Sequence, residues 1–231
     1  MKILVINPGS TSTKIAVYEN DTPRLVRNIR HTVDELSSFS HIIDQFEFRK
    51  NLVLKELEAD NIPFEFDAIV GRGGLLKPIP GGVYEVNDAM LDDILHAMRT
   101  HACNLGCLIA SELAALLPGC RAFIADPGVV DELDEIARIT GSPLMPRISI
   151  WHALNQRAIA RRYAAAQHVR YEDLDLIVCH LGGGISVGVH HHGKAVDVNN
   201  ALDGEGPFSP ERAGTLPAGQ LIDLCCSGRY T

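Results

Sequence analysis

Short apolar runs separated by polar turns dominate the first thirty residues. Residues 2–6 form one apolar run and residues 14–18 form a second that alternates partly, and residues 25–29 are expected to form a third strand. The turn at residues 7–13 between the first two runs is polar and contains glycine. Two strands joined by a short turn are typical of a β-hairpin, whereas a dinucleotide-binding unit places a helix after its first glycine turn. The pattern therefore predicts a hairpin.

Longer segments carry apolar residues at helical spacing. Helices are expected at residues 39–57, from Asn87 onward, at 104–117 and at 151–166. Asn87 is the expected N-cap of the second helix, whose apolar face would hold Met90, Leu91, Ile94, Leu95 and Met98. Short strands are expected at residues 66–70, 121–125, 174–179, 185–190 and 194–198. Helices and strands alternate along the chain, which predicts a mixed α/β fold.

A weak internal repeat indicates a duplicated fold. The strand-turn-strand pattern of residues 4–18 recurs at residues 177–189. A stretch rich in glycine and proline at residues 140–146 predicts a boundary, with one domain at 1–150 and a second at 151–231. The second domain would then be much shorter than the first, and no closing element is evident at residues 227–231. We therefore expect the chain to be the N-terminal part of a longer protein.

Composition narrows the class of protein. The 231 residues are 46% hydrophobic and 22% charged, as in an ordinary globular protein. The net charge of −8 argues against a nucleic-acid partner, and an anionic ligand would need local help from arginines and helix N-termini. No apolar run approaches the length of a membrane span, and the first residues lack the pattern of a signal peptide. We expect a cytoplasmic protein without a membrane partner.

Two groups of residues invite a metal-site hypothesis. The six cysteines, at positions 103, 107, 120, 179, 225 and 226, contain no C-x-x-C pair, so buried or half-buried thiols are favoured over a metal site. His190, His191 and His192 are consecutive, and neighbouring side chains on a strand point to opposite faces. The polar tip of a hairpin is therefore favoured over a metal site for the three histidines.

Two glycine-containing turns are candidates for phosphate binding. Residues 7–14, NPGSTSTK, offer backbone N–H groups and hydroxyls but lack the spacing of a Walker loop. Residues 180–184, HLGGG, follow a buried strand and would let a ligand approach the backbone closely. A plain hairpin turn explains either segment alone. Two such turns in a duplicated chain could hold the phosphates of a nucleotide between two lobes.

Four charged or polar residues stand beside these or other loops: Arg72 in GRGG, Asp126 in ADPG, His152 in SIWHALN and Arg212 in SPERAG. Arginine is suited to two-pronged recognition of carboxylate or phosphate. For each one, a surface role or a salt bridge that braces a loop remains an alternative, and His152 could be a packed histidine.

Six motifs in order resemble one enzyme family along the whole chain. They are ILVINPGSTSTKIAVY, GRGGLLKPIPGGVYEVN, IADPGVVDEL, RISIWHALNQRAIAR, CHLGGGISVGVH and GEGPFSPERAGTLP. In these segments the chain resembles the butyrate kinases of the acetate kinase family, within the superfamily of acetate and sugar kinases, heat-shock ATPases and actin. The resemblance implies an α/β fold with two ribonuclease-H-like domains, the second one incomplete here.

The resemblance also implies a role for each matching residue. Asn7 would lie near the transferred phosphoryl group, with Ser10 and Thr11 in the same turn. Arg72 and Arg212 would bind the carboxylate and neutralise phosphoryl oxygens, and Asp126 would help to place Mg²⁺. His152 would hydrogen-bond the phosphoryl group in the transition state. His180, Gly182, Gly183 and Gly184 would form the second phosphate loop.

The expected reaction is transfer of the γ-phosphoryl group of ATP to butyrate, with Mg²⁺. The acid is ionised at pH 7, so it needs no general base, and positive charge must offset the repulsion of two anions. A kinase for acetate, propionate or a branched-chain acid, and an inactive fragment of such a kinase, remain alternatives. The family resemblance further implies a homo-oligomer at full length and an adenosine pocket that no segment of this chain matches.

Overall fold

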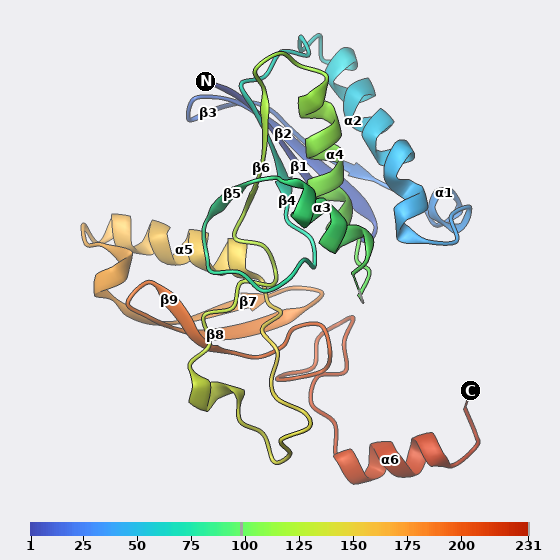
Figure 1. Ribbon diagram of the computed structural model, residues 1–231, viewed down its shortest axis with the longest axis vertical. Helices are drawn as coiled ribbons and strands as arrows, with labels where there is room; N and C mark the ends of the chain where they lie inside the picture. The colour runs from blue at the N-terminus through green and yellow to red at the C-terminus, as the bar shows by residue number, and fades with distance from the viewer. Residues whose placement is uncertain (98, 231) are drawn as a thin grey trace. The chain divides into compact units, whose positions relative to one another are not determined.

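The computed structural model describes residues 1–97 and 99–230, so Met98, expected on a helix face, lies outside the described residues. The chain forms two compact units (Figure 1). Unit 1 consists of residues 1–77 and 82–129, and unit 2 consists of residues 78–81 and 130–231. The division falls between Val129 and Val130, whereas the sequence boundary was placed after residue 150. Val130 is completely buried and packs with Leu133 and Trp151 in the core of unit 2. Unit 2 therefore begins before the boundary that the sequence predicts.

An antiparallel meander begins unit 1. Strands β1 (Lys2–Pro8), β2 (Ser12–Glu19) and β3 (Thr22–Arg30) lie side by side, and β1 pairs with β2 so that Ile6 faces Ile15. Alternate residues of β2, among them Ile15 and Val17, point into the core. The hairpin predicted from the apolar runs is confirmed.

Parallel strands extend this sheet on the other side of β1. Strand β4 (Ala68–Arg72) pairs with β1, and β6 (Arg121–Ala125) pairs with β4, both in parallel. The edge strand β5 (Val83–Glu85) runs antiparallel to β6, and the full order is β3-β2-β1-β4-β6-β5. The sequence pattern did not predict β5, because three residues are too few to show a period.

Unit 1 also contains helices. They are α1 (Val33–Ser37), α2 (Phe46–Ala59), α3 (Asp88–Leu95) and α4 (Asn104–Ala115), with a 3₁₀ turn at Ile42–Gln45 before α2. The single helix expected at residues 39–57 therefore starts as the 3₁₀ turn at Ile42 and continues as the α-helix α2. The predicted cap is confirmed, because the Asn87 side chain accepts a hydrogen bond from the Met90 backbone N–H at 3.0 Å.

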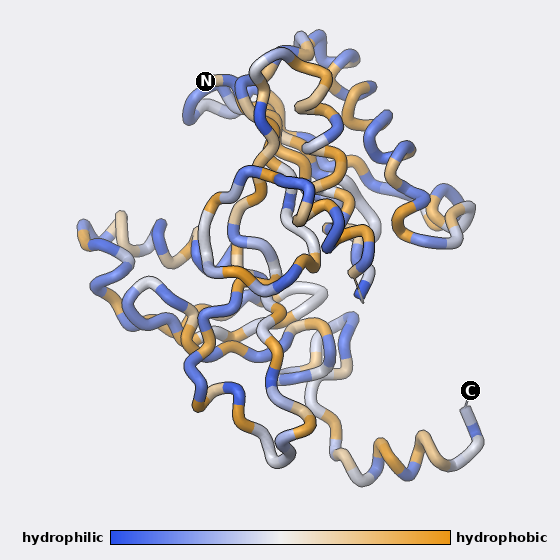
Figure 2. Tube along the Cα trace, viewed as in Figure 1, coloured by the Kyte–Doolittle hydropathy of each residue, from blue (hydrophilic) through white to orange (hydrophobic). Residues whose placement is uncertain are grey.

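Helix α4 carries the core of unit 1. Leu105, Ile109 and Leu113 are almost completely buried and pack against Ile6 and Ile69 of the sheet. Each such side chain contributes about 1.5–3 kcal/mol of burial free energy. Figure 2 shows the dense hydrophobic colouring of α4 and of the strands beneath it. This core holds the ends of β1, β4 and β6 in place.

Unit 2 repeats the meander. Strands β7 (Asp175–Leu181), β8 (Ile185–His191) and β9 (Lys194–Val198) form an antiparallel sheet in that order. Helix α5 (Ala153–Ala166) packs on β7, and 3₁₀ turns lie at Glu135–Arg138 and Tyr171–Asp173. The strand-turn-strand repeat seen in the sequence is therefore present in both units.

One further helix, α6 (Ala218–Cys226), was not expected from the sequence. None of its residues is buried, and Leu221, Ile222 and Leu224 are exposed. In Figure 2, parts of α6 carry hydrophobic colouring. None of the helices in the described part of the chain combines the length and the apolar character that a membrane span requires.

Candidate functional site

Three of the predicted site residues stand at one edge of the unit 1 sheet. Asn7, Arg72 and Asp126 lie at the carboxyl ends of β1, β4 and β6, which are parallel neighbours. In open α/β sheets, ligands bind at the carboxyl ends of the strands. Arg72 Nη1 lies 3.4 Å from Asn7 Oδ1, so the guanidinium and the amide are brought together. We call Asn7, Arg72 and Asp126 the strand-end cluster.

Close backbone packing holds this cluster against the start of α4. A Cβ atom on Gly71 would lie 2.1 Å from the Gly106 carbonyl oxygen, and one on Gly106 would lie 2.5 Å from the Arg72 carbonyl oxygen. Glycine at both positions lets the first turn of α4 approach the ends of the strands directly. A helix N-terminus attracts anions, so it adds to the positive charge of Arg72.

Asp126 is the one carboxylate of the strand-end cluster. It is 5% exposed, and its backbone adopts a left-handed conformation with φ of 36°. Its backbone N–H donates to the Gly82 carbonyl oxygen at 2.8 Å, and its Oδ1 accepts from the Gly82 N–H at 2.9 Å. These bonds hold an energetically costly backbone conformation at a strand end, which is typical of functional sites.

The first glycine turn is held from behind by a buried arginine. Ser10 and Thr11 are exposed at the tip of the turn between β1 and β2. Arg49, on α2, is completely buried and donates to Ser12 O and Thr13 Oγ1 at 3.0 Å each, and to Ser10 O at 3.4 Å. It also donates to Gln45 Oε1. Burial lowers the pKa of Arg49 to about 10, which leaves it charged at neutral pH.

In unit 2, the imidazoles of His152 and His180 stack face to face. Their ring centroids lie 3.7 Å apart and their planes differ by 5°. His152 precedes the first residue of α5, and its Nδ1 lies 2.9 Å from Ser186 Oγ. His180, near the end of β7, has its Nδ1 2.9 Å from the Asn155 amide nitrogen. The stack therefore joins the start of α5 to the hairpin of β7 and β8.

The second glycine turn lies against the same histidines. A Cβ atom on Gly184 would lie 1.7 Å from Arg212 Nη1 and 3.2 Å from His152 Cε1, and one on Gly183 would lie 2.7 Å from the Glu211 carboxylate. Only glycine leaves room for both side chains. Ser209 Oγ donates to the Gly183 carbonyl oxygen, and the Gly182 N–H donates to Gly184 O at 3.1 Å. We call the set of His152, His180, Gly182, Gly183, Gly184 and Arg212 the glycine-turn cluster.

The histidine triplet does not converge. His190 is completely buried in β8, His191 pairs with Asp175, and His192 stands at the turn with φ of 47°. The predicted hairpin tip therefore applies to His192, whereas His190 is a core residue. Across the described positions, no three His, Cys, Asp or Glu side chains lie close enough together to bind a metal ion.

The cysteines differ from the expectation of buried or half-buried thiols. Cys103 and Cys107 are buried, and burial raises the pKa of Cys107 to about 12. Cys120 is half-buried, but Cys179, Cys225 and Cys226 are exposed because they lie on β7 and α6, whose apolar faces are open. Each cysteine is a free thiol in the described structure.

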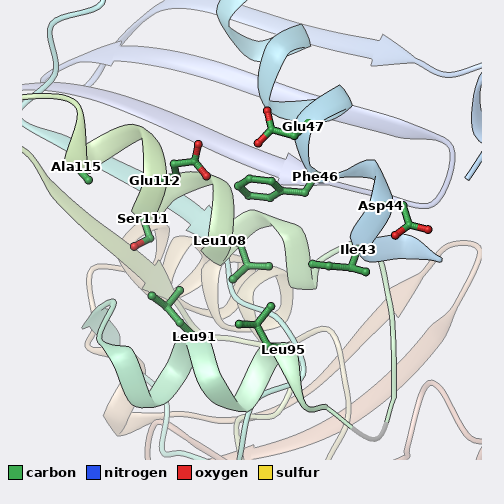
Figure 3. Close-up of a pocket in the computed structure, with 10 residues that line it drawn as sticks. All are labelled: Ile43, Asp44, Phe46, Glu47, Leu91, Leu95, Leu108, Ser111, Glu112 and Ala115. Atoms are coloured by element: carbon green, nitrogen blue, oxygen red, sulfur yellow. The ribbon is translucent and has the colours of Figure 1, made fainter.

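Unit 1 contains an apolar pocket of about 540 Å³ (Figure 3). Leu91 and Leu95 of α3, Leu108 of α4 and Phe46 of α2 point toward one another across it, and Glu47 and Glu112 stand at its side. Lys50 pairs with both of these carboxylates. None of the predicted site residues lines this pocket.

Four residues that contact the first glycine turn or the glycine-turn cluster were not singled out from the sequence: Arg49, Gln156, Ser186 and Glu211. Two of them carried a signal. Arg49 falls between Phe46 and Val53 on the apolar face of its helix, where a charge needs a partner. Gln156 lies four residues after His152, so the two share one face of α5. Ser186 faces His180 across the hairpin, which only the strand register shows.

Comparison with solved structures identifies the class of protein by its fold. No family model matches the chain. The structure resembles the crystal structure of Porphyromonas gingivalis acetate kinase, with a TM-score of 0.71, 20% sequence identity and coverage of 100% of this chain and 65% of the other. A propionate kinase from Francisella tularensis gives a TM-score of 0.67, 16% identity and the same coverage. The chain has the duplicated, actin-like ATPase fold of the acetate kinases.

Sequence comparison then gives the closer relationship. The chain is 78% identical over all 231 residues to "Probable butyrate kinase" of Bacteroides thetaiotaomicron, and 56% identical over 232 aligned positions to "Butyrate kinase 2" of Clostridium acetobutylicum. It spans 65% of the length of each of these relatives. The resemblance to the butyrate kinases that the motifs predicted is confirmed along the whole chain.

Proposed function

We propose that the protein is a carboxylate kinase that transfers the γ-phosphoryl group of ATP to butyrate. The observation that carries the proposal is the 78% identity, over the whole chain, to the protein named "Probable butyrate kinase". Two contacts support the proposal: Arg72 lies 3.4 Å from Asn7 at the ends of adjacent strands, and His152 stacks on His180 beside the second glycine turn.

The strand-end cluster and its turn suit a carboxylate and a phosphoryl group. In this proposal Arg72 binds the carboxylate of the acid, and its partner Asn7 positions the phosphoryl group. The exposed Ser10 and Thr11 offer hydroxyl groups to phosphate oxygens. Arginine can form two parallel hydrogen bonds to a carboxylate, which fixes the direction of attack as well as the position of the acid.

The glycine-turn cluster suits phosphate oxygens. Gly182, Gly183 and Gly184 present backbone that a ligand can approach closely, beside the Arg212 guanidinium. His152 donates a hydrogen bond to the phosphoryl group, and His180 supports its ring by stacking. Positive charge and N–H donors offset the developing charge of phosphoryl transfer.

Asp126 is the proposed protein ligand of Mg²⁺. Mg²⁺ is usually held by one or two carboxylates together with substrate phosphates, and one almost buried carboxylate at the strand ends fits that pattern. When bound with ATP, Mg²⁺ supplies charge neutralisation at the transferred phosphate. The protein residues position the acid and keep its anionic oxygen directed at phosphorus.

The acid itself needs no activation. A carboxylic acid with a reference pKa near 4 is ionised at neutral pH, so it can attack without a general base. The work of the site is to hold two anions in line. The mixture of Arg, Asn, His and one Asp found in the two clusters fits this task, and its product is an acyl phosphate.

The proposal also includes a choice of substrate, butyrate, among the short carboxylic acids. One methylene group changes binding by about 1–3 kcal/mol, so acetate, propionate and branched-chain acids remain alternatives to butyrate. An inactive fragment of such a kinase is a further alternative, since the chain spans 65% of its relatives. A cytoplasmic location, where ATP is available, and a homo-oligomeric assembly complete the proposal.

The proposal is tested with the 231-residue chain, ATP, Mg²⁺ and hydroxylamine, which traps acyl phosphates as hydroxamates. We expect hydroxamate formation with butyrate to exceed that with acetate, propionate and isobutyrate. A higher rate with one of the other acids would show that this acid, and not butyrate, is the preferred substrate. A folded preparation that forms no hydroxamate with any of them would contradict activity of this chain.

A further inference from the structure

A row of hydrogen bonds crosses the interior of unit 2 and ends at His152. It runs from Tyr171 OH to His190 Nδ1 at 2.5 Å, from His190 Nε2 to Gln156 Oε1 at 2.9 Å, from Gln156 Nε2 to Ser186 Oγ at 2.8 Å, and from Ser186 Oγ to His152 Nδ1 at 2.9 Å. Tyr171 is 4% exposed, and His190, Gln156 and Ser186 are completely buried. Each polar side chain in this buried row has a hydrogen-bond partner, so the row holds its members in fixed orientations.

The direction of each bond can be read from the acceptors. Gln156 Nε2 also lies 3.0 Å from the backbone carbonyl oxygen of Ser186, which can only accept. The amide nitrogen must therefore face Ser186, and the amide oxygen must face His190. His190 Nε2 then carries the proton that Gln156 Oε1 accepts.

His190 is neutral in this arrangement. Burial, with a smaller effect from the Arg157 charge, lowers the pKa of His190 to about 4. A neutral imidazole carries one proton, so Nδ1 of His190 is an acceptor and the Tyr171 hydroxyl donates to it. Tyr171, His190 and Gln156 therefore all donate in the same direction, toward Ser186.

The hydroxyl of Ser186 transmits this direction to His152. Its oxygen accepts from Gln156 Nε2 at 2.8 Å and from the His152 backbone N–H at 3.4 Å. The remaining hydroxyl proton needs an acceptor, and among the described residues His152 Nδ1 lies at hydrogen-bonding distance from it. Nδ1 of His152 is then unprotonated, and the single proton of the neutral ring lies on Nε2.

We propose that Gln156 and Ser186 are positioning residues that hold neutral His152 as its Nε2–H tautomer, so that the ring offers a donor to an anionic ligand. The benefit of this tautomer rests on the proposed function, because a phosphoryl oxygen accepts a hydrogen bond from a donor and is repelled by a lone pair. The assignment of the tautomer itself rests only on the hydrogen bonds described above.

The strand beneath the row is shaped for Gln156. Ser186, Gly188 and His190 alternate along the buried face of β8. A Cβ atom on Gly188 would lie 2.6 Å from Gln156 Oε1 and 3.2 Å from His190 Nε2. Glycine at this position therefore leaves the space that the amide occupies between Ser186 and His190.

The test is the tautomer of His152 in the full chain, read from long-range ¹H–¹⁵N correlations of ¹⁵N-histidine-labelled protein at about pH 9, where imidazoles are neutral. The His152 signals are assigned by their absence in His152→Asn. We expect the Nε2–H tautomer in the unaltered protein. A His152 ring protonated on Nδ1 would overturn the proposal, whether or not the protein is a kinase.

Two matched variants separate positioning from folding. Ser186→Ala removes the hydroxyl that donates to Nδ1, and we expect the His152 ring to become a mixture of tautomers. Ser149→Ala removes another buried serine of unit 2, which donates to Val130 O, and should leave the His152 tautomer unchanged. An unchanged, single tautomer in folded Ser186→Ala would overturn the assignment.

Kinetics give a second readout if the chain forms acyl phosphate. Ser186→Ala should lower kcat on the order of tenfold, as loss of an orienting partner of a functional histidine does, with little change in KM for the acid. Ser149→Ala should keep the kcat of the unaltered protein. Absence of any turnover would contradict the proposed function and leave the tautomer measurement to decide this proposal on its own.

Discussion

At the scale of single residues, charged groups are buried where they hold a loop. Arg49 donates to two backbone carbonyls and two side chains around the first glycine turn, and no carboxylate lies among its described partners. An arginine can serve several acceptors at once because its five donors have a fixed planar geometry. The turn of Ser10 and Thr11 therefore depends on one side chain from α2.

Arg49→Met tests this dependence. The substitution removes the charged donor from Ser12 O, which keeps the Gly9 N–H, and from Thr13 Oγ1, which keeps His31 Nε2 as a partner. A hydrogen bond to a charged group contributes about 1.5–3 kcal/mol. We expect the free energy of unfolding, measured with denaturant, to fall by about 2–4 kcal/mol. The exposed Arg30→Met should change it by less than about 0.5 kcal/mol. Equal stability of the two variants would show that the turn does not need Arg49.

His190 should make the stability of the protein depend on pH. Its pKa of about 4 lies below the unfolded value near 6.5, so the folded state binds fewer protons between these values. The contribution of neutral His190 is complete above about pH 6.5 and is lost as the pH falls toward 4, by up to about 1.4 kcal/mol per pH unit. The free energy of unfolding should therefore decrease in this window.

The measurement is denaturant unfolding between pH 4 and 7 with two variants. His190→Gln should flatten the decrease, because it removes the group that titrates. The exposed His96→Gln should keep the decrease of the unaltered protein. If all three proteins show the same pH dependence, His190 is not the group responsible.

The residue scale also shows what the sequence could not reveal about the site. The family motifs singled out the residues of both clusters as candidates, and the roles of these residues stay predictions. Ser186 was missed because its contact with His152 depends on tertiary structure, and Gln156 was missed although it shares a helix face with His152. Arg49 carried a signal, a charge on an apolar helix face, but its partners lie in a distant turn.

At the scale of elements, the close approach of α4 to the sheet positions the strand-end cluster. Gly71 and Gly106 place the backbones of β4 and α4 in direct contact, so the start of α4 adjoins Arg72. The longer elements were predicted from periodicity, because their buried faces repeat over many residues. The short elements α1, β5 and the unburied α6 were missed, since tertiary context rather than a repeating pattern determines them.

Gly106→Ala should separate these two elements. The new methyl group would lie 2.5 Å from the Arg72 carbonyl oxygen, and such overpacking costs about 1–3 kcal/mol. We expect a matching fall in the free energy of unfolding. Gly141→Ala is the matched control, because no atom lies within 4 Å of the added Cβ, and it should be close to neutral. A neutral Gly106→Ala would contradict the close approach.

At the scale of the whole molecule, the two units bury their strands to different extents. In unit 1, β1 is flanked by β2 and β4, whereas β7, the matching strand of unit 2, pairs with β8 alone in the described residues. Ile177 and Leu181 of β7 are 73% and 74% exposed. Exposed strand edges and apolar patches favour association with other chains.

We therefore expect the isolated 231-residue chain to self-associate with rising concentration. Sedimentation velocity should show this association, and the double substitution Ile177→Thr, Leu181→Thr should weaken it. Threonine is β-branched, which strands favour, and it presents less apolar area than isoleucine or leucine. The exposed Ile136→Thr is the control and should leave association unchanged. A strictly monomeric unaltered chain would show that the β7 face has no such effect.

The most direct test of the central claim is the reverse reaction, formation of ATP from butyryl phosphate and ADP with Mg²⁺. We predict that the 231-residue chain makes ATP, and that Arg72→Ala lowers kcat about a thousandfold or more while the protein stays folded, because a transition-state arginine contributes that much. Arg24→Ala, at an exposed pair with Glu19, should retain the activity. A folded chain that makes no ATP, or an Arg72→Ala variant with the full rate, would contradict the account.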